Sequence, residues 1–164
     1  MAIDESDLMF LARAVELARE ALDAGDEPFG SVLVGGDGLV LREDRNRVSG
    51  GDETLHPEFE LARWAARNMV AEERARATVY TSGEHCPMCS AAHAWVGLGR
   101  IVYAASAAQT SGWRAARGLP AGPVESLPIS VVAPGIPVDG PAPQFEAQLR
   151  DLFEQLAIRQ LRRG

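Results

Sequence analysis

The chain contains no lysine: all 16 of its basic residues are arginine, and 23 acidic residues give a formal net charge of -7. This lack disfavours a broad nucleic-acid surface, because such affinity rests largely on cations that neutralise phosphates. A local arginine patch is not excluded, but the basic end at residues 159–163 is typical of a solvated helix terminus matched to the helix dipole. Nucleic acid is therefore not the expected partner.

Long apolar runs and secretory features are also missing. No stretch of about 18 apolar residues is present to span a bilayer, and the opening MAIDESDL is acidic, unlike a signal peptide. We therefore expect a cytoplasmic protein without a membrane partner.

Cysteine is scarce, and both cysteines lie in the single run Cys86-Pro-Met-Cys89. Two residues this close together cannot form a disulfide framework. In a reducing compartment the spacing is typical of a metal site or of a redox pair.

The remaining composition is that of an ordinary globular protein, with 46% hydrophobic and 24% charged residues in 164. These values exclude a disordered, collagenous or coiled-coil chain. The length predicts a single domain over residues 1–164.

Hydrophobic periodicity predicts alternating helices and strands. Helices are expected at residues 4–24, 56–70, 87–98 and 144–161. Strands are expected at 31–35, 39–44, 77–81, 100–105 and 128–133, with a loop at 45–55 and a proline-rich connector at 134–143. Residues 109–123 give no clear pattern beyond one helical turn at 113–117. The alternation predicts an α/β fold with helices on both faces of the sheet, and the crossovers predict parallel later strands.

Two short motifs stand at the starts of two consecutive predicted helices: His56-x-Glu58 and Cys86-x-x-Cys89. One imidazole and two thiolates supply three ligands of a tetrahedral zinc ion, and a catalytic site keeps the fourth position for water. A carboxylate two residues from a ligand can move a proton to and from that water.

The two cysteines also permit interpretations other than a catalytic zinc site. A lone C-x-x-C also occurs in thiol-disulfide oxidoreductases and in structural zinc sites. A non-catalytic zinc module has no need of Glu58, and a redox pair needs free thiols. His93, four residues after Cys89, is expected to be a packed histidine, because a fourth protein ligand would close the site.

The paired motifs resemble the cytidine deaminase-like superfamily, in the branch of guanine, cytosine and tRNA adenosine deaminases. The resemblance runs from about residue 8 to residue 105. It rests on Pro28-Phe29-Gly30, on Asn46, on His56-Pro-Glu58 and on the run from Thr81 to Cys89.

The resemblance implies a three-layer α/β/α sandwich with a five-stranded mixed sheet. It implies one Zn²⁺ per chain on His56, Cys86 and Cys89, and zinc-activated water that attacks the amine-bearing ring carbon. Glu58 would be the proton shuttle, and ammonia would be released. Asn46 matches a loop asparagine that reaches the substrate, and Phe29 a position that lines the pocket.

The chain also departs from the family pattern. His85 replaces the usual proline before the first cysteine, and we expect it at the rim of the substrate. Glu84 beside it and Trp113, in the unclear segment, are further candidate substrate contacts. Residues 104–110 are uncharged, where related enzymes often carry an acidic residue. These differences leave the zinc chemistry intact and bear on the substrate.

The leading hypothesis is a hydrolytic deaminase of a free nucleobase or small nucleoside, similar to guanine deaminases. The alternative is a deaminase of cytosine or of a related aminopyrimidine or amino-triazine. A tRNA adenosine deaminase is less favoured, because the chain is acidic and has no lysine. The resemblance implies a homodimer, and Trp64, Trp95 and Phe153 are the aromatic residues expected at its interface.

Overall fold

The computed structural model describes residues 2–163, so the two end residues of the predicted domain lie outside the described part. The strands are β1 (Gly30–Val34), β2 (Val40–Arg45), β3 (Thr78–Gly83), β4 (Ile101–Ala105) and β5 (Val138–Asp139). The helices are α1 (Glu5–Asp23), α2 (Pro57–Asn68), α3 (Ala71–Arg76), α4 (Pro87–Val96), α5 (Ala107–Ala116), α6 (Ile129–Val132) and α7 (Glu146–Arg163). Two short 3₁₀ turns, Val48–Gly50 and Pro143–Phe145, complete the described chain.

The five strands of the described chain form one mixed sheet in the order β2-β1-β3-β4-β5. β1 pairs antiparallel with both β2 and β3, whereas β3–β4 and β4–β5 are parallel. The crossover through α4 produces the parallel pair, as the alternation predicted. Because β3 and β4 are parallel, the segments that follow these two strands begin at the same edge of the sheet.

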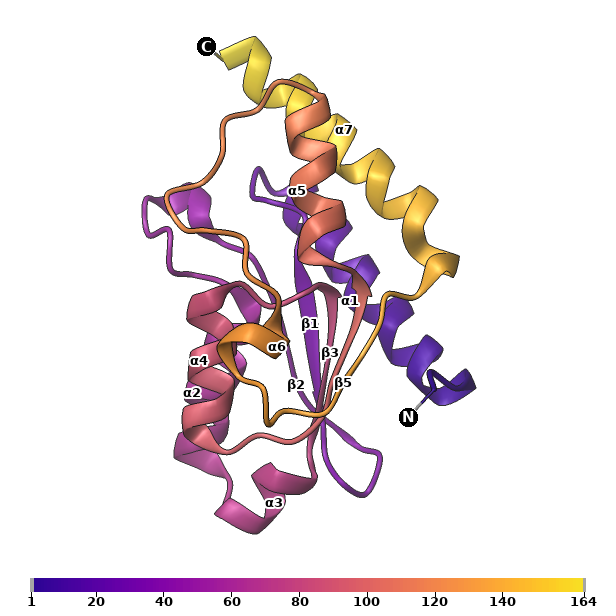
Figure 1. Cartoon of the computed structure of the whole chain (residues 1–164), viewed down its shortest axis with the longest axis vertical. Helices are drawn as coiled ribbons and strands as arrows, with labels where there is room; N and C mark the ends of the chain where they lie inside the picture. The colour runs from indigo at the N-terminus through magenta and orange to yellow at the C-terminus, as the bar shows by residue number, and fades with distance from the viewer. Residues whose placement is uncertain (1, 164) are drawn as a thin grey trace.

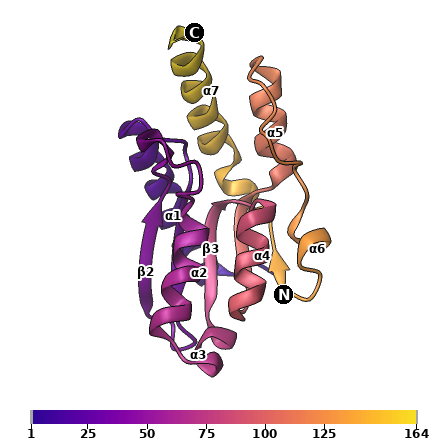
Figure 2. The same cartoon turned by 90° about the vertical axis from the view of Figure 1, so that its left-hand side faces the viewer.

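Helices cover both faces of the sheet (Figures 1 and 2). α1 and α7 pack on one face, while α2 and α4 pack on the other, with α6 beside α4. Consecutive strand residues point to opposite faces. Val32 accordingly belongs to the core under α1 and α7, and Leu33 to the core under α2 and α4. The predicted three-layer α/β/α sandwich is confirmed.

Capping explains where α1 begins and ends. The Asp4 side chain accepts from the Asp7 backbone N–H at 2.9 Å, and Asp7 returns a bond to the Asp4 N–H. At the other end Arg159 of α7 donates to the carbonyls of Leu22 and Asp26. The basic end of the chain therefore contributes a bond to α1 and is not wholly solvated.

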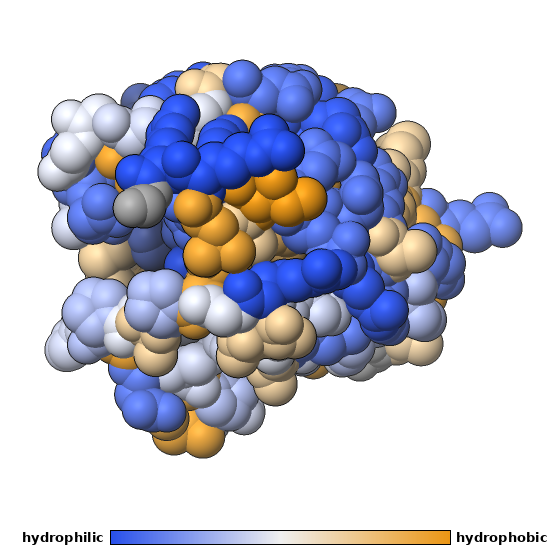
Figure 3. All heavy atoms as spheres, turned by 90° about the horizontal axis from the view of Figure 1, so that it is seen from above, coloured by the Kyte–Doolittle hydropathy of each residue, from blue (hydrophilic) through white to orange (hydrophobic). Residues whose placement is uncertain are grey.

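Figure 3 shows the surface of the molecule from above. This surface is mostly hydrophilic, with a few hydrophobic side chains among the polar ones. On α7 the exposed apolar residues are Ile158 and Leu161, which alternate with arginines. None of the helices within residues 2–163 is long and apolar enough to cross a bilayer.

Residues 128–133 were predicted to be a strand, and this is wrong. The segment forms the short helix α6, and the fifth strand is Val138–Asp139, inside the predicted connector. An apolar run this short fits a buried helical turn as well as a strand. Here the N–H of Ile129 donates to the Glu84 carboxylate, and the fully buried Ile129 side chain packs in one cluster with Ile101.

The unclear segment contains a complete helix, α5, which is longer than the single turn expected. Ser106 caps it and Gln109 closes a capping box, a serine-x-x-glutamine signal that is visible in the sequence. The interface expectation needs a correction as well. Phe153 is a core residue, 2% exposed, because α7 packs it against Phe29 and Trp113. Trp95 is 89% exposed.

Candidate metal centre and active site

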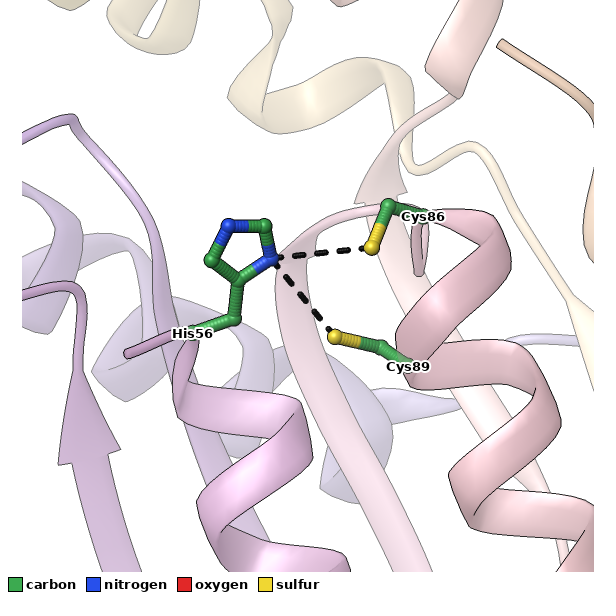
Figure 4. Close-up of side chains that lie close together, drawn as sticks. All are labelled: His56, Cys86 and Cys89. Atoms are coloured by element: carbon green, nitrogen blue, oxygen red, sulfur yellow. Dashed lines mark hydrogen bonds between the residues drawn. The ribbon is translucent and has the colours of Figure 1, made fainter. Parts of the chain in front are cut away.

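Three side chains from two helix starts meet beyond the end of β3. His56 stands immediately before α2, and Cys86 immediately before α4, each followed by a proline at the first helical position. Cys89 lies in the first turn of α4. His56 Nδ1 is 3.6 Å from each of the two sulfur atoms (Figure 4). The structure thus brings together the three residues predicted as ligands.

These distances fit a zinc ion. A tetrahedral site with Zn–N near 2.0–2.1 Å and Zn–S near 2.3 Å separates nitrogen from sulfur by about 3.6 Å. The three candidate ligand atoms lie within 4.8 Å of one another. Two thiols and one imidazole are also the donor types that zinc prefers. The residues present therefore suit zinc and supply three of the four ligands of a tetrahedral site.

The three side chains have strongly shifted pKa values. The pKa of Cys86 is lowered to about 4, mainly by its hydrogen bond with Cys89 and against the effect of burial. The pKa of Cys89 is raised by the same contact and by burial. The pKa of His56 is raised to about 9, chiefly by Cys86, with smaller contributions from the charges of Glu58 and Glu27. Negative charge is thus concentrated where a cation would bind.

Glu58 lies one residue into α2 and is buried, 5% exposed. Its Oε1 lies 2.7 Å from the Thr81 hydroxyl of β3 and 3.1 Å from the Ser31 hydroxyl of β1. Burial raises the pKa of Glu58, and the Thr81 hydrogen bond opposes that rise only in part. The structure therefore holds a buried, proton-accepting carboxyl group two residues from His56.

Asn46 and Phe29 lie on two loops that are joined by hydrogen bonds. Asn46 is buried, its backbone N–H donates to the Phe29 carbonyl, and its Oδ1 accepts from the N–H groups of Glu27 and Val48. The Phe29 ring covers Gly83, where an added Cβ would lie 2.8 Å from the ring. A side chain at the end of β3 would therefore displace the Phe29 ring.

Comparison with known proteins identifies this arrangement. Residues 4–105 match the family model described as the cytidine and deoxycytidylate deaminase zinc-binding region. The chain belongs to this family. His56, Glu58, Cys86 and Cys89 all lie within the matched residues.

Individual relatives agree with the family. The chain is 34% identical over 104 residues to a probable cytosine deaminase of Schizosaccharomyces pombe, covering 63% of each chain. It is 41% identical over 98 residues to the guanine deaminase of Bacillus subtilis, covering 58% of this chain and 62% of that one. The matches thus span just over three fifths of these curated relatives.

One solved structure extends the likeness of the fold over nearly the whole chain. The guanine deaminase of Nitrosomonas europaea superposes with a TM-score of 0.67 at 23% identity. The superposition covers 96% of this chain and 86% of that one. At this identity the likeness shows the deaminase-family fold and nothing finer.

Glu84 has contacts that differ from those expected of a substrate residue. Its two carboxylate oxygens accept the backbone N–H groups of Ala107 in α5 and of Ile129 in α6, at 2.8 and 2.9 Å. These bonds engage both oxygens, so we revise the substrate contact predicted for Glu84 to an anchoring role.

His85 is fully buried, so its predicted location at the substrate rim is wrong. Its ring meets His93 edge-on at 5.3 Å, and within residues 2–163 neither ring nitrogen has a hydrogen-bond partner. Burial lowers the pKa of His85 and keeps the ring neutral. His93 Nε2 lies 2.8 Å from the Gly99 carbonyl, in keeping with the packed role expected for it.

Trp113 is half-buried on α5, with its ring 5.7 Å from that of Phe153. The Phe29 ring packs on the same phenylalanine at 5.5 Å, so α5 and the Phe29 loop share one aromatic support. A substrate contact of Trp113 stays a prediction.

Sequence patterns missed two parts of the site. Ser31 and Thr81 lie in buried strands, where β alternation alone does not distinguish a hydroxyl aimed at Glu58 from a packed one. The ion pair of Glu27 with Arg114 joins residues 87 positions apart. A contact over that separation leaves no local signal in one sequence.

Proposed function

We propose that the protein is a zinc-dependent hydrolytic deaminase of a free nucleobase or small nucleoside. The observation that carries the proposal is the buried Glu58 carboxyl beside a three-residue zinc cradle. Three protein ligands leave the fourth tetrahedral position for water, which is the pattern of catalytic zinc sites. A structural zinc module would not require a buried acid at this place.

When bound, zinc supplies a Lewis acid that makes water acidic enough to act as a nucleophile at neutral pH. His56, Cys86 and Cys89 hold the ion. Glu58, whose pKa is raised by burial, would accept one proton from the attacking water and pass it to the ring nitrogen, and would then carry a second proton from the new hydroxyl on the ring carbon to the departing amine, which leaves as ammonia. The hydroxyls of Ser31 and Thr81 fix the carboxyl in one orientation for both transfers.

Asn46 and Phe29 suit the recognition of a planar base. The Asn46 oxygen is engaged by two backbone N–H groups, which orients its amide. Within residues 2–163 the amide nitrogen has no hydrogen-bond partner, so it is available to a carbonyl or ring nitrogen of the substrate. The half-buried Phe29 ring offers an apolar wall.

Guanine is the substrate we favour, because the identity to the guanine deaminase relative is higher, 41% against 34% for the cytosine deaminase relative. Cytosine and related aminopyrimidines or amino-triazines are the second candidates within the same chemistry. A tRNA substrate is disfavoured by the net charge of -7 and the lack of lysine. The expected partner is thus a small aminated ring.

Ammonia release tests the proposal. Zinc-loaded protein is incubated with guanine, cytosine, adenine, their nucleosides and amino-triazines, and ammonia is measured together with the metal content. We expect release from guanine above the other compounds. Release from cytosine alone would move the assignment to the second candidate, and no release from any compound would overturn the proposal.

We also propose that the protein is a homodimer, as the resemblance to the family implies. The fully solvent-facing Trp95, 89% exposed, is the one of the three expected interface aromatics that is free to contact a second copy. Light scattering coupled to size exclusion measures the assembly. A monomer at all concentrations would contradict the dimer without affecting the proposed chemistry.

A further inference from the structure

An ion pair connects α5 to the loop that carries Phe29. Arg114 Nη1 lies 2.9 Å from Glu27 Oε1, and both side chains are 25% exposed. The pair joins the C-terminal part of the chain to the turn between α1 and β1. Because it is partly shielded from water, its attraction is screened less than that of the more exposed pair of Arg117 and Glu154 nearby.

Glu27 also holds both candidate substrate residues through its backbone. Its N–H donates to Asn46 Oδ1 at 3.3 Å, and its carbonyl accepts the Phe29 N–H at 2.8 Å. The side chain and the main chain of a single residue therefore contact α5, Asn46 and Phe29. A shift of the Glu27 loop would move all three.

α5 lies next to the end of β3 that leads to Cys86 (Figure 1). An added Cβ on Gly83 would lie 3.9 Å from Thr110 Cγ2 of α5 and 2.8 Å from the Phe29 ring. Trp113 of the same helix packs on Phe153, as Phe29 does. Phe29 and Thr110 of α5 thus both lie beside Gly83 at the end of β3.

We propose that Glu27 is a positioning residue of the site: through Arg114 it holds α5 against the Phe29 loop, and through its N–H it orients the Asn46 amide. The assignment rests on the proposed deaminase function. Its consequence is that the ion pair sets substrate affinity and leaves the chemical step to Glu58 and the metal. Within residues 2–163 neither Glu27 nor Arg114 forms a hydrogen bond or ion pair with the proposed metal ligands, and the charge of Glu27 makes only a small contribution to the raised pKa of His56.

Kinetics of charge variants provide the first test. Glu27→Gln and Arg114→Gln remove the pair, and Glu27→Arg combined with Arg114→Glu restores it with reversed charges. We expect KM for the base to rise about five- to tenfold in each single variant, with kcat within about twofold. The double variant should recover a large part of the lost affinity.

Arg117→Gln is the matched control. Arg117 lies directly after the same helix and pairs with Glu154 of α7, so the variant removes an equivalent charge without touching Glu27. Its KM should equal that of the wild type. An equal rise of KM in this control, or a loss confined to kcat in the Glu27 variant, would overturn the positioning role.

Hydrogen exchange of α5 amides gives a measurement that needs no substrate. In zinc-loaded protein, exchange across residues 107–116 should increase in Glu27→Gln and Arg114→Gln and stay at the wild-type level in Arg117→Gln. Unchanged exchange in both single variants would overturn the inference. If the wild type releases no ammonia, the proposed function fails while this measurement still decides whether the pair holds α5.

Discussion

Two clusters of buried charged groups lie at opposite ends of the parallel strands, and they differ in how their charges are satisfied. At the start of β4, Arg100 binds both carboxylate oxygens of Asp7 at 2.8 and 2.9 Å. Tyr80 donates to the same carboxylate at 2.9 Å, and Arg100 also binds Asp139 at 2.7 Å. Every charge in this cluster faces an opposite charge or a donor.

The second cluster, beyond the end of β3, contains two thiols, one imidazole and the buried carboxyl of Glu58. It offers a single cation for three acidic groups, and the two cysteine pKa values are displaced in opposite directions. The charges of the first cluster are satisfied by its own residues, whereas the second offers a set of donors that suits a metal ion. Incomplete satisfaction of buried charge is therefore the feature that separates a reaction site from a structural ion pair.

Glu58→Gln should give the largest effect, and this effect should be confined to the function of the metal cluster. Turnover should fall about 10²- to 10⁴-fold, because the amide cannot transfer the proton. Zinc content should stay at the wild-type level, and the melting temperature should not fall, because a buried acid is replaced by a neutral group. Ammonia release, metal analysis and calorimetry check the three expectations.

Glu60→Gln is the control for this variant, because Glu60 lies in the same helix turn and its partly exposed carboxylate pairs with Arg63. It should retain full turnover. Wild-type turnover in Glu58→Gln would remove Glu58 from the mechanism, and loss of zinc would show that it supports the metal.

Asp7→Asn should remove the ion pair with Arg100 and so destabilise the fold. Removing one partner of a buried pair costs about 3–5 kcal/mol of unfolding free energy, and urea unfolding measures it. Activity per folded molecule should not change, because Asp7 lies far along the strands from the metal site. Glu16→Gln, in the exposed pair with Arg13, should cost less than about 1 kcal/mol. Equal losses in the two variants would contradict the distinction.

Metal removal should act on one cluster alone. Zinc at 100 times its dissociation constant should raise the unfolding free energy of the metal-free protein by about 2.7 kcal/mol. Asp7→Asn should gain the same amount, whereas Cys86→Ser should gain much less. A zinc response that survives Cys86→Ser would place the metal elsewhere.

Acidic pH should remove the stabilisation that Asp7 contributes to the cluster around Arg100. Burial alone would raise the pKa of Asp7, but the hydrogen bonds of Arg100, the Asp4 backbone and Tyr80 outweigh it and lower the pKa below 3.8. The unfolded chain therefore takes up the proton first as the pH falls. The stabilisation is present above about pH 3.8 and is lost below it. In Asp7→Asn the fall of the unfolding free energy with decreasing pH, measured by urea unfolding, should be smaller than in the wild type. An equal fall in the two proteins would contradict the assignment.

The sequence predicted the layered sheet and the ligand set because both depend on local patterns. His56, Glu58, Cys86 and Cys89 occupy helix starts that are marked by a proline at the first helical position. The C-terminal third was predicted less well. There the secondary structure depends on contacts with residues far away in the sequence. An example is the hydrogen bond from the Ile129 N–H to Glu84 at the start of the short helix α6. His85 could not be placed either, because its burial depends on packing against His93.

X-ray absorption at the zinc edge of the purified protein tests the central claim most directly. The account predicts one zinc per chain with two sulfur atoms near 2.3 Å and one nitrogen and one oxygen near 2.0–2.1 Å. The oxygen would be the open position that a deaminase requires. A shell closed by a fourth protein ligand, or a protein that binds no zinc, would contradict the account.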